Sequence, residues 1–133
     1  MRPTSTAYLL SDSDLFATCD RQERNLVDRM GAQVRRPAGT VLAREGALPR
    51  QFIVILDGVA TACHPDGVEE ITAGNAIGVR EIILRAPHIA KIVAETPVVL
   101  EVLSLREFAS LLEIVPMLAA AVAVNTARSE ASA

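Results

Sequence analysis

Short segments rich in valine and isoleucine, cut by glycine, proline and aspartate, occupy the middle of this chain and constrain its fold more than any other feature. Segments of this length and spacing are typical of β-strands joined by tight turns. Asp57-Gly58, between two such segments, fits a two-residue hairpin turn because that turn requires positive φ. The pattern predicts an antiparallel sandwich or jelly roll. The predicted strands cover residues 33–36, 41–44, 51–56, 59–63, 69–72, 89–94 and 98–103.

The composition supports a single packed domain. Half of the 133 residues are hydrophobic (50%) and 22% are charged, proportions that favour a globular core over disorder. Aromatic residues make up only 3%, so alanine, valine, isoleucine and leucine must build most of the core. A chain of this length buries enough surface to need no disulfide. We therefore expect Cys19 and Cys63 to be buried free thiols, with a disulfide as the less favoured alternative.

Charge and hydropathy weigh against several classes of protein. The formal net charge of −3 predicts no strong attraction to nucleic acid or to an anionic membrane. No apolar run reaches the roughly 18 residues that span a bilayer, and the longest, at 117–124, is much shorter. The N-terminal residues lack the apolar core of a secretion signal, so we expect a cytoplasmic protein without membrane insertion.

Helical patterns flank the predicted strands. Asp20 followed by Glu23 fits an N-terminal capping box, and Val27 and Met30 then recur at helical spacing. Gly31 is expected to close this helix as a left-handed cap.

Two further helices are predicted near the C-terminus. Ser104 and Glu107 form a second capping-box pattern ahead of an apolar helical face. Pro116 is expected to stop that helix and to begin a last one at residues 117–127, since proline is tolerated in a first helical turn.

One more predicted helix interrupts the strands. After Gly78, residues 79–84 form a pattern of one or two helical turns, which ends at residues 85–87. The first turn of a helix offers free backbone N–H groups, which suit an anion.

Four segments follow one another at a characteristic spacing: residues 38–46 (Ala-Gly-Thr-Val-Leu-Ala-Arg-Glu-Gly), 52–58 (Phe-Ile-Val-Ile-Leu-Asp-Gly), 74–78 (Gly-Asn-Ala-Ile-Gly) and 87–94 (Pro-His-Ile-Ala-Lys-Ile-Val-Ala). Together they resemble the framework of the cyclic nucleotide-binding domain, the sensor domain of catabolite-activator-type transcription factors and of kinase regulatory subunits.

The resemblance covers residues 14–127 and implies a mainly β fold. The expected architecture is an antiparallel β-roll, or jelly roll, with an N-terminal helix, an embedded short helix and two C-terminal helices. We expect this domain to span residues 13–128, between a flexible arm at 1–12 and a frayed tail at 129–133.

The resemblance also identifies a phosphate-binding cassette that opens at Gly78. In the family, a glutamate directly after this glycine accepts a hydrogen bond from the ribose 2′-hydroxyl, and an arginine ten positions after it pairs with the cyclic phosphate. Here those positions hold Val79 and His88, and the acidic position ahead of the cassette holds Asn75. Histidine lacks the bidentate, permanently charged geometry of arginine. The usual binding of cAMP or cGMP is therefore expected to be weak or lost.

The substituted cassette leaves two interpretations open. In the favoured one, Arg80 and Glu81 are solvated helix residues and His88 is an ordinary strand or turn residue. In the alternative, a rewound cassette turns Glu81 toward a ribose and Arg80, Arg85 or His88 toward a phosphate. The candidate ligand-binding residues are Gly78, Val79, Arg80, Glu81, Ile82, His88 and Ile89.

The state of the pocket separates a sensor from a module without a ligand. An empty hollow with polar groups near Gly78 and His88 favours a sensor. A hollow filled with the apolar side chains of Val79, Ile82, Ile83 and Ile89 favours a module that no longer binds a ligand.

Other chemistry has little support in the sequence. The two histidines and two cysteines lack the spacing of metal ligands, and no nucleophile stands out with a paired base. We therefore expect neither a metal site nor an enzyme. No second basic helical unit follows the predicted C-terminal helices, so direct reading of DNA is not expected.

These observations predict a stand-alone regulatory or protein-interaction module built on a bacterial-type sensor domain. Its partner is expected to be another protein, or a second copy that forms a homodimer through the C-terminal helices. One alternative is a sensor of cAMP, cGMP or another anion with an altered cassette. Another is an accessory subunit of a larger assembly.

Overall fold

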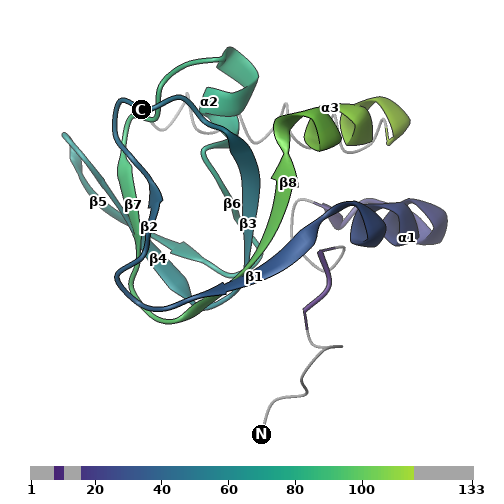
Figure 1. Ribbon diagram of the computed structural model, residues 1–133, viewed down its shortest axis with the longest axis horizontal. Helices are drawn as coiled ribbons and strands as arrows, with labels where there is room; N and C mark the ends of the chain where they lie inside the picture. The colour runs from purple at the N-terminus through teal and green to yellow at the C-terminus, as the bar shows by residue number, and fades with distance from the viewer. Residues whose placement is uncertain (1–7, 11–15, 116–133) are drawn as a thin grey trace, which may run out of the picture.

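The computed structural model describes residues 8–10 and 16–115 (Figure 1). The predicted helix at 117–127, the tail, and most of the N-terminal arm lie outside the described residues. Within the described part, Tyr8 and Leu10 are buried. No helix in this part is long and apolar enough to cross a membrane.

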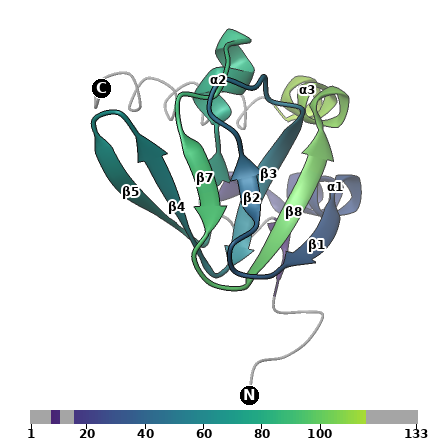
Figure 2. The same ribbon diagram turned by 60° about the vertical axis from the view of Figure 1, so that its left-hand side comes forward.

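Two antiparallel sheets form the body of the molecule, which confirms the predicted β-roll. The first sheet has the order β1 (Ala32–Arg36), β8 (Val98–Ser104), β3 (Gln51–Asp57) and β6 (Ala76–Ile77). The second has the order β2 (Val41–Ala43), β7 (Lys91–Ala94), β4 (Val59–His64) and β5 (Gly67–Thr72). Figure 2 brings the second sheet forward.

Three helices accompany the sheets in the described residues: α1 (Arg21–Met30), α2 (Val79–Leu84) and α3 (Leu105–Ile114). Figure 1 shows α1 and α3 on the same side of the roll and α2 at one end of it. Both predicted capping boxes are formed, by Asp20 with Glu23 at the start of α1 and by Ser104 with Glu107 at the start of α3. Each box satisfies two backbone N–H groups that the helix leaves unpaired.

The core consists of two clusters with different side chains. The cluster beneath the long helices holds Phe16, Phe52 and Phe108, which are all the phenylalanines of the chain. The rings of Phe52 and Phe108 stack with their centroids 4.1 Å apart. The other cluster lies between the sheets, where alanine is the commonest residue, as at Ala43 and Ala60. The roll interior is therefore lined by small and aliphatic side chains.

The Asp57-Gly58 turn is formed, but the prediction of a hairpin there is wrong. β3 pairs with β6 and β8, whereas β4 pairs with β5 and β7, so the turn carries the chain from one sheet to the other. Gly58 has φ +95°, and a Cβ atom there would lie 2.4 Å from the Pro97 carbonyl oxygen. The local turn signal sets the backbone conformation, while distant strands decide the pairing.

Gly31 also differs from its prediction as a left-handed cap. It is extended, with φ −100° and ψ 171°, because the chain passes from α1 directly into β1. A Cβ atom on Gly31 would lie 2.8 Å from Oε2 of Glu101. The absence of a side chain at Gly31 leaves room for the buried side chain of Glu101, and the position does not require positive φ.

Three local details correct the sequence-based predictions. Both cysteines are free, but only Cys19 is buried and Cys63 is exposed. The two-residue strand Ala76–Ile77 was not predicted, because it is too short to show an alternating pattern. The strand expected from residue 89 begins at Lys91, since His88 pairs with the connection between β2 and β3 and the Ile89 N–H donates to the side chain of Glu81.

Candidate functional site

Gly78 opens the cassette in a conformation that favours glycine. It is the N-terminal cap of α2, with φ 65° and ψ 31°, and it makes no side-chain cap hydrogen bond. The imidazole of His88 lies directly against it. A Cβ atom on Gly78 would stand 2.7 Å from Cε1 and 2.9 Å from Nδ1 of His88. The space that glycine leaves at this position is therefore occupied by the histidine ring.

Backbone hydrogen bonds hold His88 in this position. The Gly46 N–H donates to the His88 carbonyl oxygen at 2.8 Å, and the His88 N–H donates to the Ala47 carbonyl oxygen at 2.9 Å. The loop that follows α2 is thereby fixed to the connection between β2 and β3. His88 is a loop residue, and its side chain is only 10% exposed.

Glu81 faces the same loop, which corrects the prediction that it is a solvated helix residue. The residue is 7% exposed. Its Oε1 atom accepts a long hydrogen bond from the Ile89 N–H at 3.4 Å and lies 3.8 Å from Nδ1 of His88. Nδ1 is buried without a hydrogen-bond partner. At 3.8 Å the two side chains form an ion pair when the imidazole is protonated.

The other candidate residues do not join this cluster. Val79 is 4% exposed and packs in the phenylalanine-containing core, with Ile82 against the same core. Ile89 exposes 53% of its surface and contributes its backbone N–H. Arg80 is partly buried rather than fully solvated. The structure thus brings together Gly78, Glu81, His88 and the backbone of Ile89.

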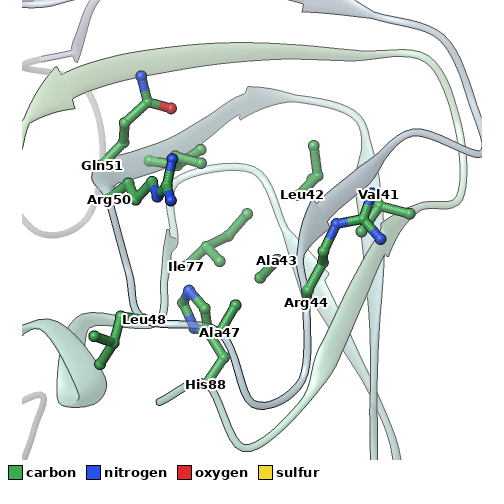
Figure 3. A pocket seen from close by; sticks show the side chains of 11 residues that line it. Val41, Leu42, Ala43, Arg44, Ala47, Leu48, Arg50, Gln51, Ile77 and His88 are labelled. Atoms are coloured by element: carbon green, nitrogen blue, oxygen red, sulfur yellow. The ribbon is translucent and has the colours of Figure 1, made fainter. Parts of the chain in front are cut away.

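A pocket of about 420 Å³ opens beside this cluster. Its walls are β2, the connection from β2 to β3, the start of β3, Ile77 and His88 (Figure 3). No residue of α2 lines it, and neither does Ile89, so the apolar cassette side chains do not fill this hollow. His88 therefore contacts Gly78 and also forms part of the pocket wall.

Two arginines that line this pocket were not among the predicted site residues. Arg44 follows the last residue of β2 and Arg50 precedes the first residue of β3, and both line the pocket. The signal available in the sequence was a pair of arginines on either side of the Gly46 turn. That signal is weak, because exposed arginines in loops are common.

The described residues contain no group of three or more histidine, cysteine, aspartate or glutamate side chains that would hold a metal ion. The titratable side chains of the Gly78–Glu81–His88 cluster and of the pocket wall are one carboxylate, one imidazole and two guanidinium groups. The guanidinium groups and a protonated imidazole can bind an anion by charge and hydrogen bonding, whereas the carboxylate repels it.

Residues 33–114 match the family model of the cyclic nucleotide-binding domain. None of the curated proteins searched matches the chain. Solved structures with a similar fold include the Thermus thermophilus catabolite activator protein, at 19% identity and a TM-score of 0.78. That match covers 89% of this chain and 58% of the other.

Two further solved structures have the same fold. The regulatory subunit of a cAMP-independent protein kinase A from Trypanosoma brucei has 25% identity and a TM-score of 0.70, over 79% of this chain and 41% of the other. The sensor domain of the transcriptional regulator DNR from Pseudomonas aeruginosa has 18% identity and a TM-score of 0.72, over 91% of this chain and 90% of the other. The chain thus spans less than two thirds of the catabolite activator and of the kinase subunit.

Proposed function

The chain belongs to the cyclic nucleotide-binding domain family, and we propose that within it the chain is a regulatory or protein-interaction module in which the usual binding of cyclic nucleotides is weakened. The observation that carries this proposal is the contact between Gly78 and the ring of His88. A phosphate that approaches the backbone at Gly78 meets an imidazole there instead of open space.

The carboxylate of Glu81, next to His88, supports the same conclusion. Glu81 is 7% exposed, and its Oε1 atom is 3.8 Å from Nδ1 of His88. A carboxylate in a partly dehydrated site repels an incoming phosphate more strongly than one in bulk water, because water screens the charges less. The carboxylate also competes with any ligand for the protonated imidazole. Both effects oppose a cyclic phosphate in the cassette.

The similar solved structures include a regulatory subunit described as bound to cAMP and one described as belonging to a cAMP-independent kinase. The Trypanosoma brucei relative is described as the regulatory subunit of a cAMP-independent kinase, and a mutant of it is described as bound to cAMP. A regulatory role for the present chain therefore does not require the usual nucleotide binding.

Thermal unfolding in the presence of nucleotide tests the proposal. A ligand present at 1,000 times its dissociation constant stabilises the folded state by about 4 kcal/mol, which raises the unfolding midpoint by several degrees. We expect 1 mM cAMP or cGMP to leave the midpoint unchanged, within the shift caused by 1 mM AMP as a matched non-cyclic control. A rise of several degrees that is specific to a cyclic nucleotide would overturn the proposal.

The second candidate function is a sensor of cAMP, cGMP or another anion through an altered site. The pocket beside His88 favours it, since the apolar cassette side chains do not fill that hollow. In this case His88→Ala should lower affinity for the anion at least several-fold, while Cys63→Ala, at an exposed position of β4, leaves it unchanged.

The partner of a regulatory module is proposed to be another protein or a second copy of the chain, through the C-terminal helices. Of these helices α3 is described, and Ile114 near its end exposes 56% of its surface. We propose that the module is cytoplasmic and that it neither catalyses a reaction nor binds DNA directly. The same holds for the alternative in which it is an accessory subunit of a larger assembly. Sedimentation at rising concentration separates the homodimer from a module that binds a different protein.

A further inference from the structure

The pocket between β2 and β3 has the size and the lining of a small-molecule site. Its volume of about 420 Å³ falls within the range of roughly 300–1,000 Å³ that is usual for ligand pockets. The inner wall is apolar and includes Leu42, Ile53 and Ile77. These residues belong to or pack against the aliphatic cluster inside the roll. An apolar part of a ligand would therefore lie against aliphatic side chains.

The outer wall carries positive charge. Arg44 and Arg50 line the pocket and are both exposed. Neither side chain forms a hydrogen bond or an ion pair with another residue of the described part of the chain. A guanidinium group without an internal partner is free to form bidentate hydrogen bonds to a carboxylate, sulfonate or phosphate.

The connection that carries Arg44 is held in place before any ligand binds. The Ala47 N–H donates to the Arg44 carbonyl oxygen at 3.1 Å, and the Gly46 N–H donates to the His88 carbonyl oxygen at 2.8 Å. The His88 N–H returns a bond to Ala47 at 2.9 Å. A pre-organised loop loses little conformational entropy on binding, which favours affinity.

We infer that this pocket binds an amphipathic organic anion, whose apolar body enters the roll and whose single anionic group pairs with Arg44 or Arg50 on the pocket wall. The site shares His88 with the cassette, but no residue of α2 lines it and the rest of its lining comes from β2, β3, the connection between them and Ile77. The aliphatic inner wall offers few partners to a heavily hydroxylated ligand such as a ribose. An aromatic or alkyl body with one charged group matches the lining better.

This inference rests on the second candidate function, the anion sensor, and deepens it by naming the ligand class of the pocket beside His88; it does not rest on the first. The proposed function concerns the approach of a cyclic phosphate to Gly78. The inference concerns Arg44 and Arg50, which line the pocket and do not belong to the cassette, so the weakening of cyclic nucleotide binding and the anion site can each fail while the other holds.

A matched pair of fluorescent probes tests the inference on the full chain. 1-Anilinonaphthalene-8-sulfonate carries an aromatic body and one sulfonate, and N-phenyl-1-naphthylamine is the same body without the charge. We expect saturable binding of the sulfonate probe at one site per folded chain. The variant with both Arg44→Gln and Arg50→Gln should bind the sulfonate probe about ten- to a hundred-fold more weakly. Its affinity for the neutral probe should change less than about three-fold.

A charge-matched control and a blocking variant complete the test. The variant with Arg35→Gln and Arg106→Gln removes two exposed arginines that do not line the pocket, and should bind both probes as the unmodified chain does. Ala47→Trp places a bulky ring at the exposed mouth and should weaken both probes. Circular dichroism confirms that each variant is folded. The inference is overturned if the folded chain shows no saturable site, if the double arginine variant keeps full affinity for the sulfonate probe, or if Ala47→Trp binds both probes unchanged.

Discussion

The imidazole ring of His88 lies against the backbone of Gly78, at 2.7 Å from the position that a Cβ atom on Gly78 would take. Gly78 also has φ 65°. Two separate constraints therefore require glycine here: a left-handed backbone, which disfavours any residue with a Cβ atom, and the ring that fills the space above it.

The two constraints can be separated by a mutant cycle. We expect Gly78→Ala to lower the free energy of unfolding by about 2–4 kcal/mol, from backbone strain and from the clash with His88. In a His88→Ala background, the same change should cost only the backbone part, about 1–2 kcal/mol. Gly39→Ala is the control, because Gly39 also has positive φ but no atom within 4 Å of its added Cβ. Urea unfolding measures each value, and equal costs in both backgrounds would contradict the clash.

Glu81 is expected to restrain the loop after α2 through its side chain. Its carboxylate accepts the Ile89 N–H at 3.4 Å, while its backbone carbonyl accepts the Ala86 N–H at 3.0 Å. Glu81→Ala removes the first bond and keeps the second. Hydrogen exchange should therefore accelerate at least several-fold at Ile89, with a smaller change at Ala86. Equal acceleration at both amides would mean that the whole turn has unfolded.

Glu101 should make stability depend on pH in an unusual direction. Burial, and secondarily the charge of Asp28, raises the pKa of Glu101 from 4.5 to about 7. The residue is 3% exposed, and its Oε2 atom has no hydrogen-bond partner. The folded state therefore binds more protons than the unfolded state between pH 4.5 and 7, so this group lowers stability as pH rises through that window.

The matching variant is Glu101→Gln, which resembles the protonated acid. At pH 8 we expect it to raise the free energy of unfolding by about 1–3 kcal/mol, because a charge no longer has to be buried. Near pH 5 the change should be close to zero. Glu70→Gln, on exposed β5, should have little effect at either pH. A loss of stability for Glu101→Gln at pH 8 would show that the carboxylate has a stabilising partner.

The two free cysteines should react at very different rates. Cys63 is exposed, whereas Cys19 is buried and desolvation raises the pKa of its thiol. The thiolate is the reactive form. A thiol reagent at pH 8 should therefore modify one cysteine per native chain and two in denaturant. Cys63→Ala should abolish the fast reaction, and a fast phase that persists in this variant would show that Cys19 is accessible.

The strands were largely predictable because their signals are local. The strands predicted from valine- and isoleucine-rich segments between turns have nearly the same bounds as the observed strands. Both capping boxes depend on residues three positions apart. The pairing at Asp57-Gly58 was not predictable from the turn, since distant β8 and β7 compete for β3 and β4.

The site was predictable only in part, for the same physical reason. The motif framework identified Gly78 and His88, which are in contact. The inward position of Glu81 depends on the loop at residues 85–90, which folds back onto α2, and no local pattern encodes it. Arg44 and Arg50 likewise lie at one pocket only because β2 and β3 belong to different sheets whose ends meet there.

The central claim is that the ring of His88 and the carboxylate of Glu81 weaken the usual binding of cyclic nucleotides. Isothermal titration of the folded chain with cAMP and with cGMP tests it most directly. The account predicts no saturable heat up to high-micromolar ligand for either nucleotide. A one-site isotherm with a low-micromolar dissociation constant for either of them would contradict it.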